Sequence, residues 1–254
     1  LADECGFPRD QIRENWWPGV FSYNDLPAIS MTPYEMEFPH EPQLDLHYVG
    51  PMVHEGRNET SAVRHDGQDI DELLAECKSA GAKLILATVS TLHAGDVDFL
   101  RRLTEAVAPK GDWRLFIGLG GRLDSAGLGE LPANVHTFAY VPQLRMLREA
   151  DLSINHAGIH TIHECIHFVA PQLIYSGKRS DQPGCAARVH FHGLGLMADK
   201  DTDDVMSIQK KIVEVLDLPT YRNNVEEMRR KVVSYAMLGK LEKVVAHYLR
   251  RQTH

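Results

Sequence analysis

The sequence predicts an α/β fold in which a parallel sheet carries helices on both faces. From about residue 69 onward, short apolar segments alternate with stretches in which apolar residues recur at helical spacing. The apolar segments are short and continuous, which is typical of strands buried on both faces of a parallel sheet. This alternation favours crossover units, in which each helix connects two parallel strands.

The predicted elements follow in chain order. Strands are expected at residues 83–89, 113–117, 135–138, 152–155, 172–175 and 194–197. Helices are expected at residues 69–80, 95–108, 143–148, 161–168, 184–190, 205–216 and 221–249, the last with a break near Gly239. Pro171 follows the 161–168 helix and cannot continue it, because proline lacks the N–H and its ring clashes with the preceding turn.

Residues 1–50 are rich in aromatic residues and prolines and do not form the pattern of a complete domain. Two short strand-like segments stand out there, at 28–31 and 46–49. We interpret residues 1–50 as the C-terminal part of a preceding domain, 51–68 as a polar linker and 69–254 as the second domain. Because the chain begins with Leu1, we expect a fragment or a processed chain.

Composition narrows the classes of partner. The formal net charge is −8, with 27 basic and 35 acidic residues, so no binding to nucleic acid is expected. No apolar run approaches the roughly 20 residues that cross a bilayer, so no membrane span is expected. The cysteines have no C-x-x-C spacing and are expected to be reduced thiols, which favours a cytoplasmic location; they are Cys5, Cys77, Cys165 and Cys185.

The segment 155–164 carries the most chemistry. His156 ends a short apolar strand, a turn of small residues follows, and a helix is expected to open at Thr161. A helix N-terminus offers unpaired N–H groups and the positive end of a dipole, which suits a phosphate. Thr161 and His156 add donors, while the Glu164 carboxylate can accept hydrogen bonds from a ribose diol. The segment therefore predicts a sugar-nucleotide site.

The other strand-end loops are expected to open on the same rim, because ligands of open parallel sheets lie at the carboxyl ends of the strands. These loops are residues 90–91, 118–121, 140–143, 156–158, 176–182 and 198–199.

Four motifs in these loops occur in a set order across about forty residues. They are Tyr140-Val141-Pro142-Gln143, then His156-x-Gly158-x-x-Thr161-x-x-Glu164, then Pro171, then Asp181-Gln182. Together they resemble the donor-binding signature of family 1 glycosyltransferases, the GT-B group that includes UDP-glycosyltransferases and macrolide glycosyltransferases. The resemblance implies a GT-B type, Rossmann-like parallel sheet, preceded here by the tail of an N-terminal domain.

The resemblance also implies roles for residues around the nucleoside. Tyr140 would stack on the nucleobase, where the family more often has Trp. Val141 would meet the base edge through its backbone, and Gln143 would contact the nucleoside. Glu164 would bind the ribose.

Further roles concern the diphosphate and the sugar. His156 and Thr161 would bind the diphosphate, and Gly158 would allow close backbone approach. Asp181 and Gln182 would read hydroxyls of the transferred sugar, and Ser90 is a further candidate for a diphosphate or sugar contact. Ala157 stands where the family usually has Gly or Cys, which is tolerable if its backbone angle is ordinary.

The resemblance implies transfer of a sugar from a UDP or TDP sugar to a small hydroxylated acceptor, with inversion and with no metal or cofactor. The general base of such enzymes is a histidine near the start of the N-terminal domain. This chain is therefore expected to hold a sugar nucleotide but not to transfer the sugar by itself. Its expected partners are the donor, the acceptor and the missing N-terminal domain.

Three alternatives stay open at this point. One is a nucleotide-sugar epimerase, which uses the same kind of cleft. Another is a zinc protease, because His163-Glu164-Cys165-Ile166-His167 is a literal H-E-x-x-H, which places two imidazoles on one helical face. The third is a binding module that acts only with a partner chain.

Overall fold

The structure is a computed structural model that describes residues 27–41, 46–51, 53–59, 69–89, 96–121, 123, 125–177 and 181–251. It separates into two units. One groups the residues up to Pro51 with those from Val232 onward, and the other comprises residues 52–231. The predicted boundary after residue 50 falls next to this division. Residues 232–254, assigned by sequence to the second domain, group with the first unit instead.

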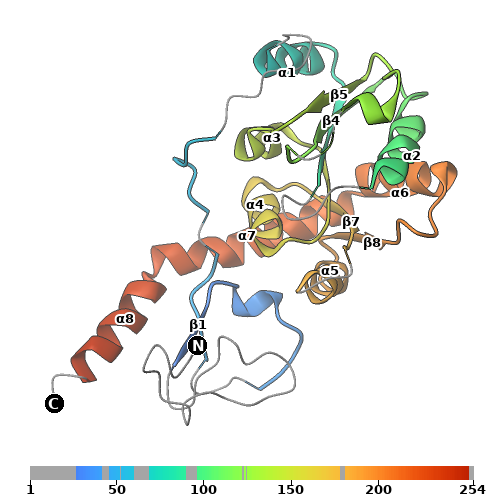
Figure 1. The fold of residues 1–254 in the computed structure, drawn as a ribbon. Helices are drawn as coiled ribbons and strands as arrows, with labels where there is room; N and C mark the ends of the chain where they lie inside the picture. Colours follow the sequence, from blue (N-terminus) through green and yellow to red (C-terminus); the bar gives the residue numbers. More distant parts are fainter. Residues whose placement is uncertain are drawn as a thin grey trace, which may run out of the picture. The chain divides into compact units, whose positions relative to one another are not determined.

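The larger unit holds a six-stranded sheet in which every pair of neighbouring strands is parallel. This confirms the predicted α/β fold (Figure 1). The strand order is β5-β4-β3-β6-β7-β8. Their bounds are β3 Lys83–Thr88, β4 Trp113–Gly118, β5 Val135–Phe138, β6 Leu152–Asn155, β7 Gln172–Tyr175 and β8 Gly195–Ala198.

Helices connect these strands and cover both faces of the sheet (Figure 1). They are α1 Ile70–Ser79, α2 Val97–Val107, α3 Gln143–Glu149, α4 Ile159–Phe168, α5 Gln182–Phe191, α6 Val205–Asp217 and α7 Pro219–Met237, the last of which continues into the other unit. Helix α4 begins two residues before the predicted start. Gly158 already has extended N-cap geometry and its carbonyl accepts from the N–H of Ile162, so Thr161 is the third helical residue.

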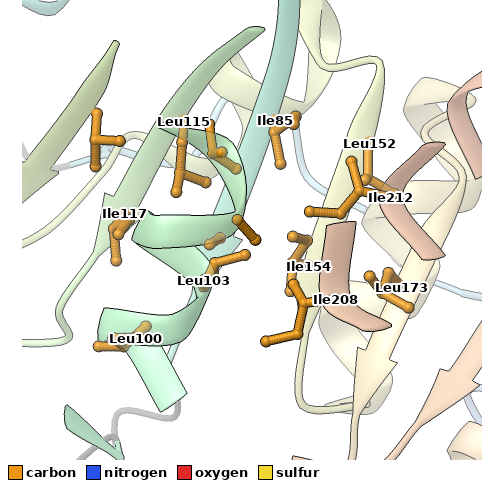
Figure 2. Close-up of a cluster of buried hydrophobic side chains, with 14 of the residues drawn as sticks. Ile85, Leu100, Leu103, Leu115, Ile117, Leu152, Ile154, Leu173, Ile208 and Ile212 are labelled. Carbon is orange, nitrogen blue, oxygen red and sulfur yellow. The ribbon is translucent and has the colours of Figure 1, made fainter. Parts of the chain in front are cut away.

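Alternate residues of β3 face the two sides of the sheet and build two cores. Ile85 and Ala87 belong to a core with helices α2 and α6, and Figure 2 shows Leu100, Leu103, Ile208 and Ile212 of those helices closing over the sheet. On the other face, Leu84 and Leu86 belong to a core with α1 and α3. Burial on both faces explains why the strands read as continuous apolar segments.

The smaller unit contains the parallel strands β1 Ala28–Ser30 and β2 Leu46–Tyr48, the short 3-10 helix Tyr34–Met36, and helix α8 Lys240–Arg251. The hydroxyl of Tyr235 accepts from the N–H of Tyr34 at 3.1 Å and donates to Glu35 at 2.5 Å. Gly50 has φ +82, and a Cβ there would lie 2.6 Å from the Tyr235 Cβ. These contacts explain why residues after 231 group with the first 51.

The helix break, the cysteines and the question of a membrane span also bear on the sequence expectations. The helix break falls as predicted, because α7 ends at Met237 and Gly239 has φ +55 before α8 begins. Cys77, Cys165 and Cys185 are buried and form no disulfide. Among the described residues, no helix combines the length and the apolar character that crossing a bilayer requires.

Candidate functional site

The sheet order places β3 and β6 side by side, although the chain leaves them in opposite directions across the sheet. Such a topological switch point is where open α/β sheets bind ligands. A cavity of about 210 Å³ lies there. It is lined by Thr88, Val89, Gln143, His156, Gly158, Ile159, His160 and Thr161. Four sequence-predicted residues are therefore brought together, namely Gln143, His156, Gly158 and Thr161.

The N-terminus of α4 opens on this cavity without a side-chain cap. Its N-cap residue is Gly158, which has no side chain to accept from the first-turn N–H groups. Ile159, His160 and Thr161 form that first turn and line the cavity. These N–H groups and the positive end of the helix dipole are consequently available to an anion.

The turn between β6 and α4 is held by a buried amide. Ala157 has φ 66, the left-handed conformation, so the condition under which alanine would be readily tolerated there is not met. The side chain of Asn155 accepts from the N–H of Ala157 at 2.9 Å and donates to Gln172 at 3.2 Å. This network stabilises a conformation that alanine adopts only at a cost. The strain lies directly before the open helix end.

Gly158 allows His156 to lie against the backbone. A Cβ at Gly158 would be 3.1 Å from Nε2 of His156, which is tighter than ordinary packing. Gly158 itself has φ −65, so glycine is favoured here by space and not by its backbone angle.

Three predicted residues form one hydrogen-bonded group. Nε2 of Gln143 donates to the hydroxyl of Thr161 at 3.3 Å and to Oε2 of Glu164. Oε1 of Glu164 accepts from Arg57 at 2.5 Å. The side chain of Glu164 is only 6% exposed, and it does not line the cavity.

Tyr140 and Val141 follow β5 on the same rim. The side chain of Tyr140 is half-exposed, with a relative exposure of 50%, and its ring tip lies against the backbone of Gly121. A Cβ at Gly121, where φ is +69, would overlap the Tyr140 hydroxyl. Val141 lies against Gly118 at the end of β4. The ring is therefore fixed at its hydroxyl end and partly exposed on this rim.

Two other predicted residues lie outside the cavity. Asp181 is the N-cap residue of α5 and Gln182 begins that helix, beside the end of β7. The Gln182 side chain accepts from the N–H of Gly177 at 3.0 Å. Ser90 lies outside the described residues.

Sequence reasoning missed several residues of the site. Thr88 and Val89 line the cavity and directly precede Ser90, the residue that the sequence suggested at this strand end. His160 also lines the cavity but was given no role from the sequence. His160 directly precedes the predicted helix start at Thr161, and because α4 begins at Ile159 it lies in the first turn of the observed helix. Arg57 carried no local signal, because its partner Glu164 is distant in sequence.

The histidines of the H-E-x-x-H segment do not form a zinc centre. His163 is buried, and burial followed by the nearby His160 lowers its pKa from 6.5 to about 4. His167 pairs instead with Glu55 at 2.8 Å, and Glu164 pairs with Arg57. No group of three or more His, Cys, Asp or Glu residues in the described parts is arranged to hold a metal ion. The zinc protease alternative has no support.

Comparison with known proteins adds independent information. Residues 117–241 match the family described as "Erythromycin biosynthesis protein CIII-like, C-terminal domain". The chain is 33% identical over 128 residues to oleandomycin glycosyltransferase of Streptomyces antibioticus, covering 50% of this chain and 29% of that protein. It is 26% identical over 185 residues to the NDP-glycosyltransferase YjiC of Bacillus subtilis, covering 73% of this chain and 43% of that protein.

Solved structures agree with this fold. The calicheamicin glycosyltransferase CalG4 superposes with a TM-score of 0.73 at 19% identity, covering all of this chain and 66% of that chain. The glycosyltransferase VinC, solved in complex with DTDP, gives a TM-score of 0.61 at 20% identity, covering 87% of this chain and 52% of that one. The chain spans less than half the length of the two curated relatives.

Proposed function

We propose that the cavity of this chain binds the diphosphate of a sugar nucleotide. The chain belongs to the family 1 glycosyltransferases of GT-B fold and contains their C-terminal domain. One observation carries this proposal. The uncapped N-terminus of α4 opens on a cavity at the topological switch point, beside the imidazoles of His156 and His160. Backbone N–H groups, a helix dipole and two imidazoles together favour a dianionic group.

The whole reaction we propose is transfer of a sugar from a UDP sugar or TDP sugar to a small hydroxylated acceptor, with inversion and with UDP or TDP as the leaving group. A nucleoside diphosphate gains negative charge as its sugar departs, and preorganised donors aimed at that charge lower the barrier. In this chain His156, Thr161 and the α4 N-terminus would supply those donors. The greater length of the relatives fits a preceding domain, which we propose binds the acceptor and carries the base.

The other predicted residues fit roles around the same ligand. Tyr140 offers a half-exposed ring to a nucleobase, with Val141 beside it. Glu164, whose carboxylate is nearly buried, is proposed for the ribose. Asp181, Gln182 and Ser90 are proposed for the transferred sugar. The cavity is smaller than the roughly 300 Å³ at which small-molecule pockets begin, so it holds part of a sugar nucleotide before any rearrangement.

Calorimetric titration of UDP and TDP into the chain tests this proposal without needing catalysis. We expect His156→Ala to weaken both affinities by about thirtyfold, roughly 2 kcal/mol, because a hydrogen bond to a charged group contributes about that much. The control is His190→Ala, since His190 is exposed near the end of α5 and away from the cavity. Equal affinities in wild type and His156→Ala would contradict the assignment of the diphosphate site. Robust sugar transfer by this chain alone would contradict the proposal that a preceding domain carries the base.

A further inference from the structure

The segment 53–59 is fastened to the two helices that carry the site. The carboxylate of Glu59 accepts from the N–H groups of Leu144 at 2.9 Å and Arg145 at 3.2 Å. It therefore caps helix α3, whose own N-cap residue, Pro142, supplies no side-chain acceptor. Glu55 of the same segment bonds His167 of α4 at 2.8 Å. The segment thus bridges α3 and α4.

Arg57 lies between these two anchors and reaches Glu164. Its guanidinium donates to Oε1 of Glu164 at 2.5 Å and to Glu59 at 3.2 Å. The Arg57 side chain is 41% exposed, whereas that of Glu164 is 6% exposed. A nearly buried carboxylate needs a compensating charge, and Arg57 supplies it in the structure.

This pairing closes the part of the site that a ribose would use. Both oxygens of Glu164 already accept hydrogen bonds, one from Arg57 and the other from Gln143. The cavity reaches Gln143 and Thr161 but not Glu164. Its diphosphate end is open, while the carboxylate behind Gln143 and Arg57 is not accessible to a diol.

We propose that Arg57 is a latch on the ribose subsite, displaced from Glu164 when a ribose diol binds. The inference rests on the proposed function, because it assigns the Glu164 carboxylate to ribose. It identifies Arg57 as a residue that makes the site respond differently to ligands with and without a ribose. A nucleoside diphosphate must break the Arg57–Glu164 pair, whereas inorganic pyrophosphate occupies the diphosphate end without disturbing it.

Removing the guanidinium of Arg57 should affect the binding of UDP and of pyrophosphate differently. Arg57→Met keeps most of the aliphatic stem but cannot pair with Glu164. We expect it to tighten UDP binding by about twofold to fivefold, the range that a partly exposed ion pair contributes. Pyrophosphate binding should not tighten, since that ligand never opens the latch. Both are measured by calorimetric titration, with circular dichroism showing that the variants are folded.

Two controls locate the effect. Arg148→Met removes another arginine that pairs with the same segment, through Glu55 at 2.7 Å, but does not touch Glu164. It should leave UDP affinity unchanged, and a gain as large as that of Arg57→Met would overturn the latch by showing that any loosening of the segment suffices. In the Glu164→Gln background, Arg57→Met should have no further effect, because the pair is already lost.

The remaining outcomes are distinguishable. If UDP binds Arg57→Met with equal or weaker affinity than wild type, the latch is wrong while the donor site stands. If neither UDP nor pyrophosphate binds wild type or any variant, the proposed function fails and the latch fails with it.

Discussion

Helices α2 and α4 follow the two strands that flank the switch point, yet they begin in opposite ways. Helix α2 is capped by Asp96, whose carboxylate accepts from the N–H of Phe99 at 3.1 Å. Helix α4 begins at Gly158 with no side-chain cap. Their buried faces differ as well, since α2 buries apolar residues and Thr104 whereas α4 also buries His163 and Glu164.

The difference separates a helix whose start is stabilised by its own cap from one whose start we propose to bind an anion. Helices α1 and α6 are capped like α2, by Asp69 and Asp204. A capping aspartate satisfies the first-turn N–H groups and places a negative charge at the helix end. The same residue at the start of α4 would occupy the groups that an anion needs. Helix α5 also begins without a side-chain cap, at Asp181, but its first residues do not line the cavity, whereas those of α4 do. The uncapped start of α4 is therefore the one that we propose for the anion.

Gly158→Asp gives α4 the start that α2 has, and we expect it to have the largest effect. The new carboxylate would accept from the first-turn N–H groups and repel a diphosphate. UDP affinity should fall by about a thousandfold, roughly 4 kcal/mol, while the free energy of unfolding changes by less than about 0.5 kcal/mol, since aspartate exceeds glycine as an N-cap by only a few tenths. Calorimetry and urea unfolding measure the two quantities.

Gly158→Ala is the matched control for this variant. Its methyl group would lie 3.1 Å from Nε2 of His156 and so displaces the ring without adding charge. It should weaken UDP binding far less than the aspartate does. Equal losses in the two variants would mean that crowding at His156, and not the occupied helix end, excludes the anion.

The buried histidine of α4 predicts a loss of stability in acid. Burial, with a smaller contribution from His160, lowers the pKa of His163 to about 4 from an ordinary 6.5. The unfolded chain therefore binds this proton first as pH falls, so stability present above pH 6.5 is lost progressively down to about pH 4. The loss attributable to His163 is at most about 3 kcal/mol. No such term arises from the buried face of α2.

Urea unfolding at a series of pH values between 7 and 4 measures this loss, and His163→Leu is the comparison. Nε2 of His163 has no hydrogen-bond partner among the described residues, so leucine removes no bond that they contain. The variant should lose distinctly less stability than wild type over this range. Parallel pH curves for the two proteins would show that His163 does not titrate as proposed.

Many of the strands and helices, including the two compared above, could be predicted from the sequence. The parallel strands were predictable because burial on both faces leaves continuous apolar segments such as 83–88 and 152–155. The helix after β6 was predictable from its spacing, and so was the position of His156, Gly158 and Thr161 around its start. These features depend on neighbours in sequence, where periodicity and residue type carry the information.

The parts that escaped prediction depend on distant residues or on backbone angles. The left-handed Ala157 is stabilised by Asn155 and Gln172, which nothing in the local pattern reveals. Glu59 caps α3 from 85 residues away, and Arg57 meets Glu164 across 107. A polar linker and a long-range cap have the same composition, so only the folded structure distinguishes them.

Asp96→Ala gives α2 an uncapped start like that of α4. Of the variants in this comparison, we expect it to have the smallest effect. It removes the cap of α2 and a half-exposed ion pair with Lys200 at 3.3 Å. We expect the free energy of unfolding to fall by about 1 kcal/mol, mostly from the lost cap, because such exposed pairs contribute little. Asp96→Asn keeps an acceptor at the helix end and should recover most of that loss.

UDP affinity should be unchanged in both variants, since Asp96 does not line the cavity. A change in affinity as large as that of Gly158→Ala would mean that the two helix ends are coupled, and the division between a stabilising and a binding helix would no longer hold.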